Sequence, residues 1–186
     1  IRRDITELHY KRPMGTLVVR VLDADLQLPT HNRIHLTASD GKLYVPNDAY
    51  ARAGSRGDLI FHNNGTFELT LPVGAVSLTA VKGFEFTPTE VEIDIEEGKV
   101  VQLTIELNRL TDMGAKGWYS ASTHVHSNYG GNLHNTLENL MMMSRAEDQD
   151  LVLEQVANKD NRILDYHYFE PGGVAHSVSE EDQIVV

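Results

Sequence analysis

The chain has 186 residues and a formal net charge of -11, with 16 Lys and Arg against 27 Asp and Glu. Binding of nucleic-acid phosphates needs clustered basic side chains, so this balance argues against a nucleic-acid partner. Cysteine is absent, which excludes disulfides, thiolate metal sites and cysteine nucleophiles and leaves His, Asp and Glu for metal chemistry. No apolar run is long enough for a membrane-spanning helix. A hydrophobic content of 41% is ordinary for a globular protein with a packed core.

The first half of the chain has the pattern of an all-β domain. Residues 1–13 are charged and lack a clear period, which indicates an N-terminal arm. From residue 14 to 109, short runs alternate between apolar and polar residues, as is typical of half-buried strands. Turn sequences separate these runs: Asp40-Gly41, Asn63-Asn64-Gly65, Pro72-Val73-Gly74 and Glu97-Gly98. The pattern predicts seven or eight strands in two packed antiparallel sheets, a β-sandwich, with residues 46–57 as a surface loop that could also bind a ligand.

The second half, residues 110–186, changes to a pattern of alternating strands and helices. The expected elements are a strand over 119–125, a helix from Asn135 or Thr136 to about Glu147, a strand over 151–157 and a further strand beginning at 184. Two strands joined by a helix favour parallel pairing and an α/β domain. Because about 70 residues cannot cover both faces of such a sheet, we expect this domain to continue beyond residue 186. Uncovered sheet faces would also favour a homo-oligomer.

His124 and His126 are the main candidates for a functional site. They stand at the C-terminal end of the first predicted strand of the α/β part, just before the turn at residues 128–131. Residues two apart in a strand project from the same face, about 7 Å apart, so two imidazoles there can bind one metal ion. Ligands collect at this end of the strands in α/β folds. The spacing alone is weak evidence, because an ordinary pair of strand histidines has the same spacing.

Three further residues are candidate metal ligands. Glu147 and Asp148 stand at the expected helix end, where one carboxylate could complete a His-His-carboxylate set suited to Zn, Mn or Fe. A solvated carboxylate pair is the alternative. His176 follows two glycines on a loop expected near the same end of the sheet. The histidines of the arm and the sandwich carry no catalytic suggestion: His9, His31, His35 and His62. No catalytic residue is identified, and no Gly-x-Ser-x-Gly nucleophile motif is present.

Two resemblances to known families cover nearly the whole chain. The motifs at residues 15–25, 64–74 and 81–86 resemble the carboxypeptidase regulatory-like domains, which are transthyretin-type sandwiches. A second set of motifs resembles the start of the PHP-type metal-dependent hydrolases of the CehA/McbA group: Gly117-Trp118, His124-Val125-His126, Asn128-Tyr129-Gly130-Gly131, Glu138-Asn139-Leu140 and Ala146-Glu147-Asp148. In that group a regulatory-like sandwich commonly precedes the metal domain.

The second resemblance implies a distorted β/α barrel with a His-rich cluster of divalent transition metal, Zn, Mn or Fe. It implies hydrolysis of phosphoester, ester or amide-like bonds of an unidentified small molecule by metal-activated water, and export from the cell. Further Glu and His ligands of the family pattern would lie beyond residue 186, so this chain alone is expected to be inactive. The alternative is a non-catalytic binding or spacer protein, whose β-sandwich docks to a surface or a carbohydrate.

Overall fold

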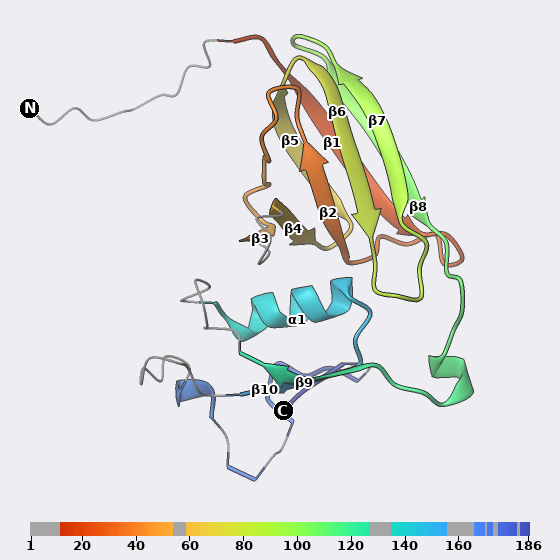
Figure 1. Cartoon of the computed structure of the whole chain (residues 1–186), viewed down its shortest axis with the longest axis vertical. Coiled ribbons are helices and arrows are strands. Elements are labelled where there is room, and N and C mark those ends of the chain that lie inside the picture. The colour runs from red at the N-terminus through yellow and green to blue at the C-terminus, as the bar shows by residue number, and fades with distance from the viewer. Residues whose placement is uncertain are drawn as a thin grey trace, which may run out of the picture.

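The structure is a computed structural model with two parts, a β-sandwich and a smaller unit of parallel strands and one helix (Figure 1). It describes residues 12–53, 59–126, 135–155, 166–169, 171–172, 175–181 and 183–186. No helix within these ranges is long and apolar enough to cross a membrane.

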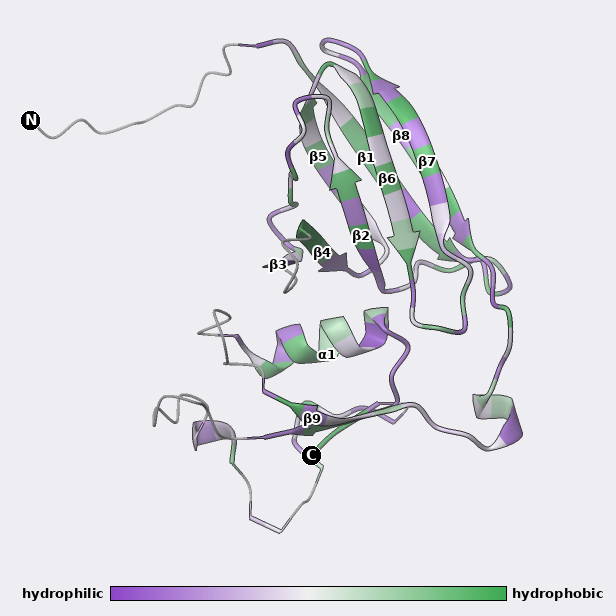
Figure 2. Ribbon diagram, viewed as in Figure 1, coloured by the Kyte–Doolittle hydropathy of each residue, from purple (hydrophilic) through white to green (hydrophobic). Residues whose placement is uncertain are grey.

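The sandwich contains eight strands in two sheets. They are β1 (Met14–Asp23), β2 (Asn32–Thr37), β3 (Tyr50–Ala53), β4 (Leu59–Asn63), β5 (Thr66–Pro72), β6 (Gly74–Val81), β7 (Thr89–Ile95) and β8 (Val100–Leu107). One sheet has the order β5-β1-β8 and the other the order β3-β4-β2-β6-β7. Hydrophobic and hydrophilic residues alternate along these strands (Figure 2), and the inward side chains of both sheets form one core. The predicted β-sandwich is therefore confirmed.

Two details of the sandwich differ from the prediction. The first strand, β1, pairs with the last, β8, in parallel, so the sandwich is not purely antiparallel. Alternating burial reports which face of a strand is buried and carries no information on strand direction. The second difference is β3, which lies inside the predicted loop at residues 46–57 and pairs with β4 in antiparallel register.

The smaller unit consists of β9 (Ala121–Val125), α1 (Leu137–Ala146), β10 (Leu151–Glu154) and β11 (Ile184–Val185), with short 3-10 turns at Gly114–Lys116 and Tyr166–Tyr168. Its three strands pair in parallel in the order β11-β10-β9. Thr136 caps the helix, since its hydroxyl oxygen accepts a hydrogen bond from the Asn139 amide at 3.3 Å. The predicted strand-helix-strand order and the N-cap are thus both found.

Helix α1 forms the layer between the parallel sheet and the sandwich (Figure 1). Its apolar side chains Leu137, Leu140 and Met141 are buried with Val152 and Val185 of the parallel strands. The other side of the helix contacts β2, β3 and β4 of the sandwich. The sandwich therefore covers the helix of the smaller unit and does not stand apart from it.

Removing a side chain from the centre of the sandwich should destabilise it strongly. Leu78 on β6 is fully buried, whereas Leu110 is 71% exposed. We expect Leu78→Ala to lower the free energy of unfolding by about 3 kcal/mol, because the substitution leaves a cavity in the core. Leu110→Ala should change it by no more than about 0.5 kcal/mol. Urea unfolding of the two variants measures the difference, and equal losses would contradict the assigned core.

Candidate functional site

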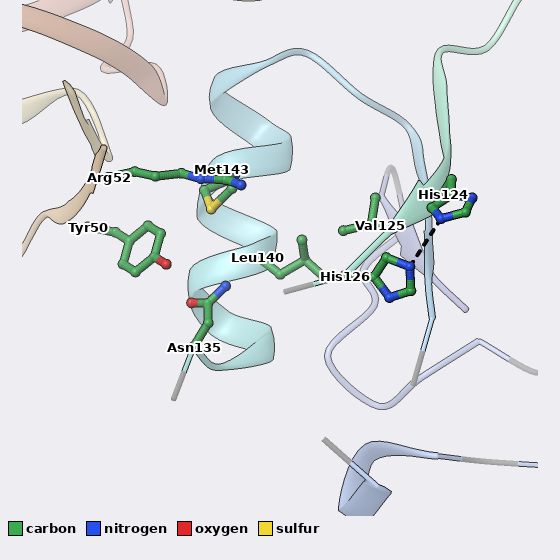
Figure 3. Close-up of a pocket in the computed structure, with 8 residues that line it drawn as sticks. All are labelled: Tyr50, Arg52, His124, Val125, His126, Asn135, Leu140 and Met143. Atoms are coloured by element: carbon green, nitrogen blue, oxygen red, sulfur yellow. Dashed lines mark hydrogen bonds between the residues drawn. The ribbon is translucent and has the colours of Figure 1, made fainter. Parts of the chain in front are cut away.

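The two histidines at the end of β9 lie as the strand period predicts. Their Nε2 atoms are 3.1 Å apart (dashed line in Figure 3), and the ring centroids are 4.9 Å apart with the rings at 72°. Nδ1 of His126 lies 3.0 Å from the backbone oxygen of Gln155, just after β10. A carbonyl oxygen can only accept a hydrogen bond, so this contact favours the proton on Nδ1 and leaves Nε2 of His126 with its lone pair.

This arrangement fits a divalent transition metal. Two nitrogens bound to one tetrahedral zinc ion at the usual bond length are about 3.3 Å apart, close to the 3.1 Å between His124 and His126. Metal-bound histidines usually donate their second N–H to a carbonyl or carboxylate, and the Gln155 carbonyl stands in that position. Among the described residues, no group of three or more His, Asp and Glu side chains is gathered as a metal site. Within the described ranges, the candidate metal site therefore consists of His124 and His126 alone.

The structure does not bring Glu147 and Asp148, the predicted carboxylate ligands at the helix end, together with the histidine pair. Glu147 Oε1 lies 2.6 Å from Arg33 Nη1 and 3.5 Å from His62 Nε2. Asp148 lies 3.5 Å from Lys82 Nζ and 3.3 Å from an Arg109 guanidinium nitrogen. Both carboxylates thus pair with basic side chains of the sandwich and its C-terminal border. These partners are distant in sequence, and the local pattern at the helix end could not reveal them.

These six side chains form a helix-end clamp: Glu147, Asp148, Arg33, His62, Lys82 and Arg109. Two hydrogen bonds to the last turn of α1 reinforce it, from Lys82 Nζ to the Arg145 carbonyl at 2.8 Å and from the Gly83 amide to the Ala146 carbonyl at 3.2 Å. The last carbonyls of a helix lack partners within the helix and attract positive charge. The sandwich supplies both the hydrogen-bond donors and the positive charge for this helix end.

Gly83 is required in the helix-end clamp by its backbone and by its surroundings. Its φ of +45° lies in the left-handed region, which side chains disfavour. A Cβ atom at this position would lie 2.6 Å from the Glu147 carbonyl oxygen. The close approach of the two parts of the chain therefore depends on a glycine here.

Burial and neighbouring charges shift the pKa values of Glu147 and Lys82 in the helix-end clamp. Burial alone would raise the pKa of Glu147, but the hydrogen bond from His62 and the charge of Arg33 outweigh burial and lower it. Burial lowers the pKa of Lys82, although the neighbouring Asp148 carboxylate opposes this effect. Glu147 is therefore held in its charged form.

A pocket of about 210 Å³ opens between β3 of the sandwich and the histidine pair (Figure 3). Its lining residues come from both parts of the chain: Tyr50, Arg52, His124, Val125, His126, Asn135, Leu140 and Met143. Burial raises the pKa of the Tyr50 hydroxyl, against the opposing charge of Arg52. The sequence analysis missed Tyr50 and Arg52 because they fall in the predicted loop. The alternation in Tyr-Ala-Arg-Ala at 50–53 was the signal that could have identified a strand there.

His176 lies beside β11, at the opposite edge of the parallel sheet from β9 and the histidine pair. Its amide donates to the Val185 carbonyl of β11 at 2.7 Å, and its Nδ1 accepts from the Val178 amide at 3.3 Å. Since β10 separates β11 from β9, His176 is not brought together with His124 and His126. The turn at residues 128–131 that follows the pair lies outside the described residues.

A second, polar pocket of about 260 Å³ lies beside the helix-end clamp. Its lining includes His31, Lys82, Arg145, Asp148 and Gln183. Burial, together with the positive charges of Arg145 and Lys82, lowers the pKa of His31 to about 4. His31 is therefore neutral at physiological pH, and its protonation in acid would place a positive charge beside the helix-end clamp.

Comparisons with known proteins do not identify a family. No protein-family model matches the chain, and no curated protein matches it. The chain is similar to the minor pilin GBS52 of Streptococcus agalactiae, with a TM-score of 0.38 and 18% identity over 54% of this chain and 47% of that one. The Bacillus anthracis TIE protein matches with a TM-score of 0.37 and 16% identity over 52% of this chain and 17% of that one. BcpA, the major pilin subunit of Bacillus cereus, matches with a TM-score of 0.36 and 19% identity over 52% of this chain and 30% of that one. The chain thus spans less than half of each structure, and TM-scores this low carry no argument about function.

Neutralising one carboxylate of the helix-end clamp should loosen α1. Glu147→Gln leaves Arg33 and His62 facing an uncharged amide, and we expect a loss of about 1 kcal/mol because the pair is partly screened by solvent. Urea unfolding gives the total loss, and hydrogen exchange should show it in the amides of α1. Glu92→Gln on β7 is the control, since Glu92 is exposed and should change neither measurement. Unaltered exchange in α1 of the Glu147 variant would contradict the clamp.

Acid should destabilise the protein through His31. The pKa of His31 is about 4 in the folded state and 6.5 in the reference state, so the unfolded chain takes up a proton first as the pH falls. Stability is therefore complete above the reference value and declines as the pH falls from 6.5 toward 4. Thermal unfolding from about pH 7.5 to about pH 5 should show a smaller decline for His31→Gln than for the wild type. The exposed-residue control His167→Gln should decline like the wild type, and parallel curves for all three proteins would refute this role of His31.

Proposed function

We propose that the chain binds a divalent transition metal through His124 and His126, as part of a metal-dependent hydrolase site of the PHP type. The observation that carries the proposal is the 3.1 Å between the two Nε2 atoms at the carboxyl end of a parallel strand. The carbonyl of Gln155 orients the His126 ring for such a role. The resemblance of the surrounding motifs to the CehA/McbA group supports the same interpretation.

In this proposal the two histidines hold the ion, which is Zn, Mn or Fe by the chemistry of the donors. A bound ion of this kind lowers the pKa of its water to about 7 and polarises the bond to be cleaved. The substrate classes, phosphoesters, esters or amide-like bonds, and export from the cell come from the resemblance alone. The helix-end clamp positions α1, and the sandwich supplies β3 to the pocket beside the histidines.

The second candidate function is a non-catalytic binding or spacer protein, in which the sandwich docks to a surface or a carbohydrate. One observation favours it: the described residues gather no third His, Asp or Glu ligand around the histidine pair. Metal content after chelator-free purification separates the two candidates, since a spacer has no need of a bound ion. Self-association through exposed sheet faces stays a prediction under both.

Zinc binding tests the proposed metal site directly. We expect isothermal titration to show one zinc ion per chain, bound weakly because only two protein ligands are identified and tight sites use three or four. His124→Ala combined with His126→Ala should abolish binding. His176→Ala should leave it unchanged, because His176 lies beside β11. Undiminished zinc binding by the double variant would show that the histidine pair is only part of a strand.

A further inference from the structure

The pocket beside the histidine pair has a cationic side, supplied by the sandwich. Arg52 on β3 lines it opposite α1, while His124 and His126 line it from β9 (Figure 3). No Asp or Glu is among the described residues that line this pocket, although the chain as a whole has a net charge of -11. A pocket without carboxylates in an acidic protein suits a negatively charged ligand.

Arg52 differs from most arginines of the described residues in having no carboxylate within ion-pair distance. Four others each contact a carboxylate: Arg12 with Asp40, Arg33 with Glu147, Arg109 with Glu85 and Arg145 with Glu180. Arg52 makes no such contact within the described ranges, although its side chain is half-buried. Arg20 also lacks an ion pair there, but it is exposed to solvent on β1. A half-buried guanidinium needs an anion or water to replace the hydrogen bonds it gives up.

The remainder of the pocket lining is apolar except for Tyr50 and Asn135. Tyr50 stands two residues before Arg52 on the same face of β3, and Val125, Leu140 and Met143 line the space between β3 and the histidines. A ligand that fills the pocket therefore has a charged group at one end and an apolar or aromatic body. The planar guanidinium group binds carboxylate and phosphate oxygens in a bidentate manner.

We propose that this pocket binds a small molecule that carries a carboxylate or phosphate group on Arg52 and rests its apolar body against Tyr50, Leu140 and Met143. The ligand then lies beside His124 and His126, where the proposed metal would act on it. This inference names the ligand class of the proposed site and rests on the proposed function for the role of the metal. The anion contact itself needs no metal.

Binding of phenyl phosphate and benzoate, measured by isothermal titration on the whole metal-free chain, tests the inference. Both probes combine an oxyanion with a ring, and phenol serves as the uncharged comparison. We expect at least one oxyanion probe to bind about tenfold or more tightly than phenol, and Arg52→Gln to remove that difference. The tighter of the two oxyanions identifies carboxylate or phosphate as the preferred group. Added salt should weaken binding, because the contact is an ion pair.

Two further variants keep the result interpretable. Arg52→Lys retains the charge without the bidentate fork and should bind with intermediate affinity, while Arg20→Gln should bind like the wild type. Oxyanion binding that is unchanged in Arg52→Gln, or no tighter than that of phenol, overturns the inference.

Zinc titration of the same proteins separates this inference from the proposed function. Arg52→Gln should bind zinc as the wild type does, because Arg52 is not a ligand. The double histidine variant should lose zinc and still bind the oxyanion probe. If the wild type binds the oxyanion probe but not zinc, the metal site alone is overturned. If it binds zinc but not the oxyanion probe, the anion site alone is overturned.

Discussion

The arrangement of the whole molecule depends on how the last turn of α1 is held. Its carbonyls and the two carboxylates that follow meet the cations Arg33, Lys82 and Arg109. A single exposed ion pair contributes little, but these groups are half-buried and share partners. Removing one member therefore leaves another charge without compensation in a poorly hydrated place. This interaction holds α1 between the parallel sheet and the sandwich (Figure 1), and β3 and the end of β9 then line the same pocket.

The contact between the sandwich and α1 bears on whether the sandwich acts as a spacer. A spacer domain is expected to have a small polar contact with its neighbour and to move relative to it. Here the sandwich covers one side of α1, contributes Tyr50 and Arg52 to a pocket shared with the histidine pair, and accepts a tight backbone approach at Gly83. The candidate site therefore includes residues from both parts of the chain.

The features that could be predicted from sequence are those set by local periodicity. Alternation with a period of two identified the strands of the sandwich and placed His124 and His126 on one face, and the Thr136 cap marked the start of α1. Features set by contacts between distant segments could not be predicted. The parallel pairing of β1 with β8 and the cation partners of Glu147 and Asp148 are of this kind. Arg52 belongs with them, because only the structure shows that no carboxylate of the described residues pairs with it.

The geometry of the histidine pair is itself a product of long-range pairing. Gln155 donates its backbone amide to the Val125 carbonyl at 2.7 Å and accepts from His126 Nδ1 at 3.0 Å, so the carboxyl ends of β9 and β10 together orient the ring. The register shifts between Val152 and Glu154, so that Glu154 pairs with Val125 and Gln155 follows at the end of β9. Two parallel strands need a crossover connection between them, and α1 lies in the crossover from β9 to β10. The orientation of His126 therefore depends on the same helix whose end the sandwich holds.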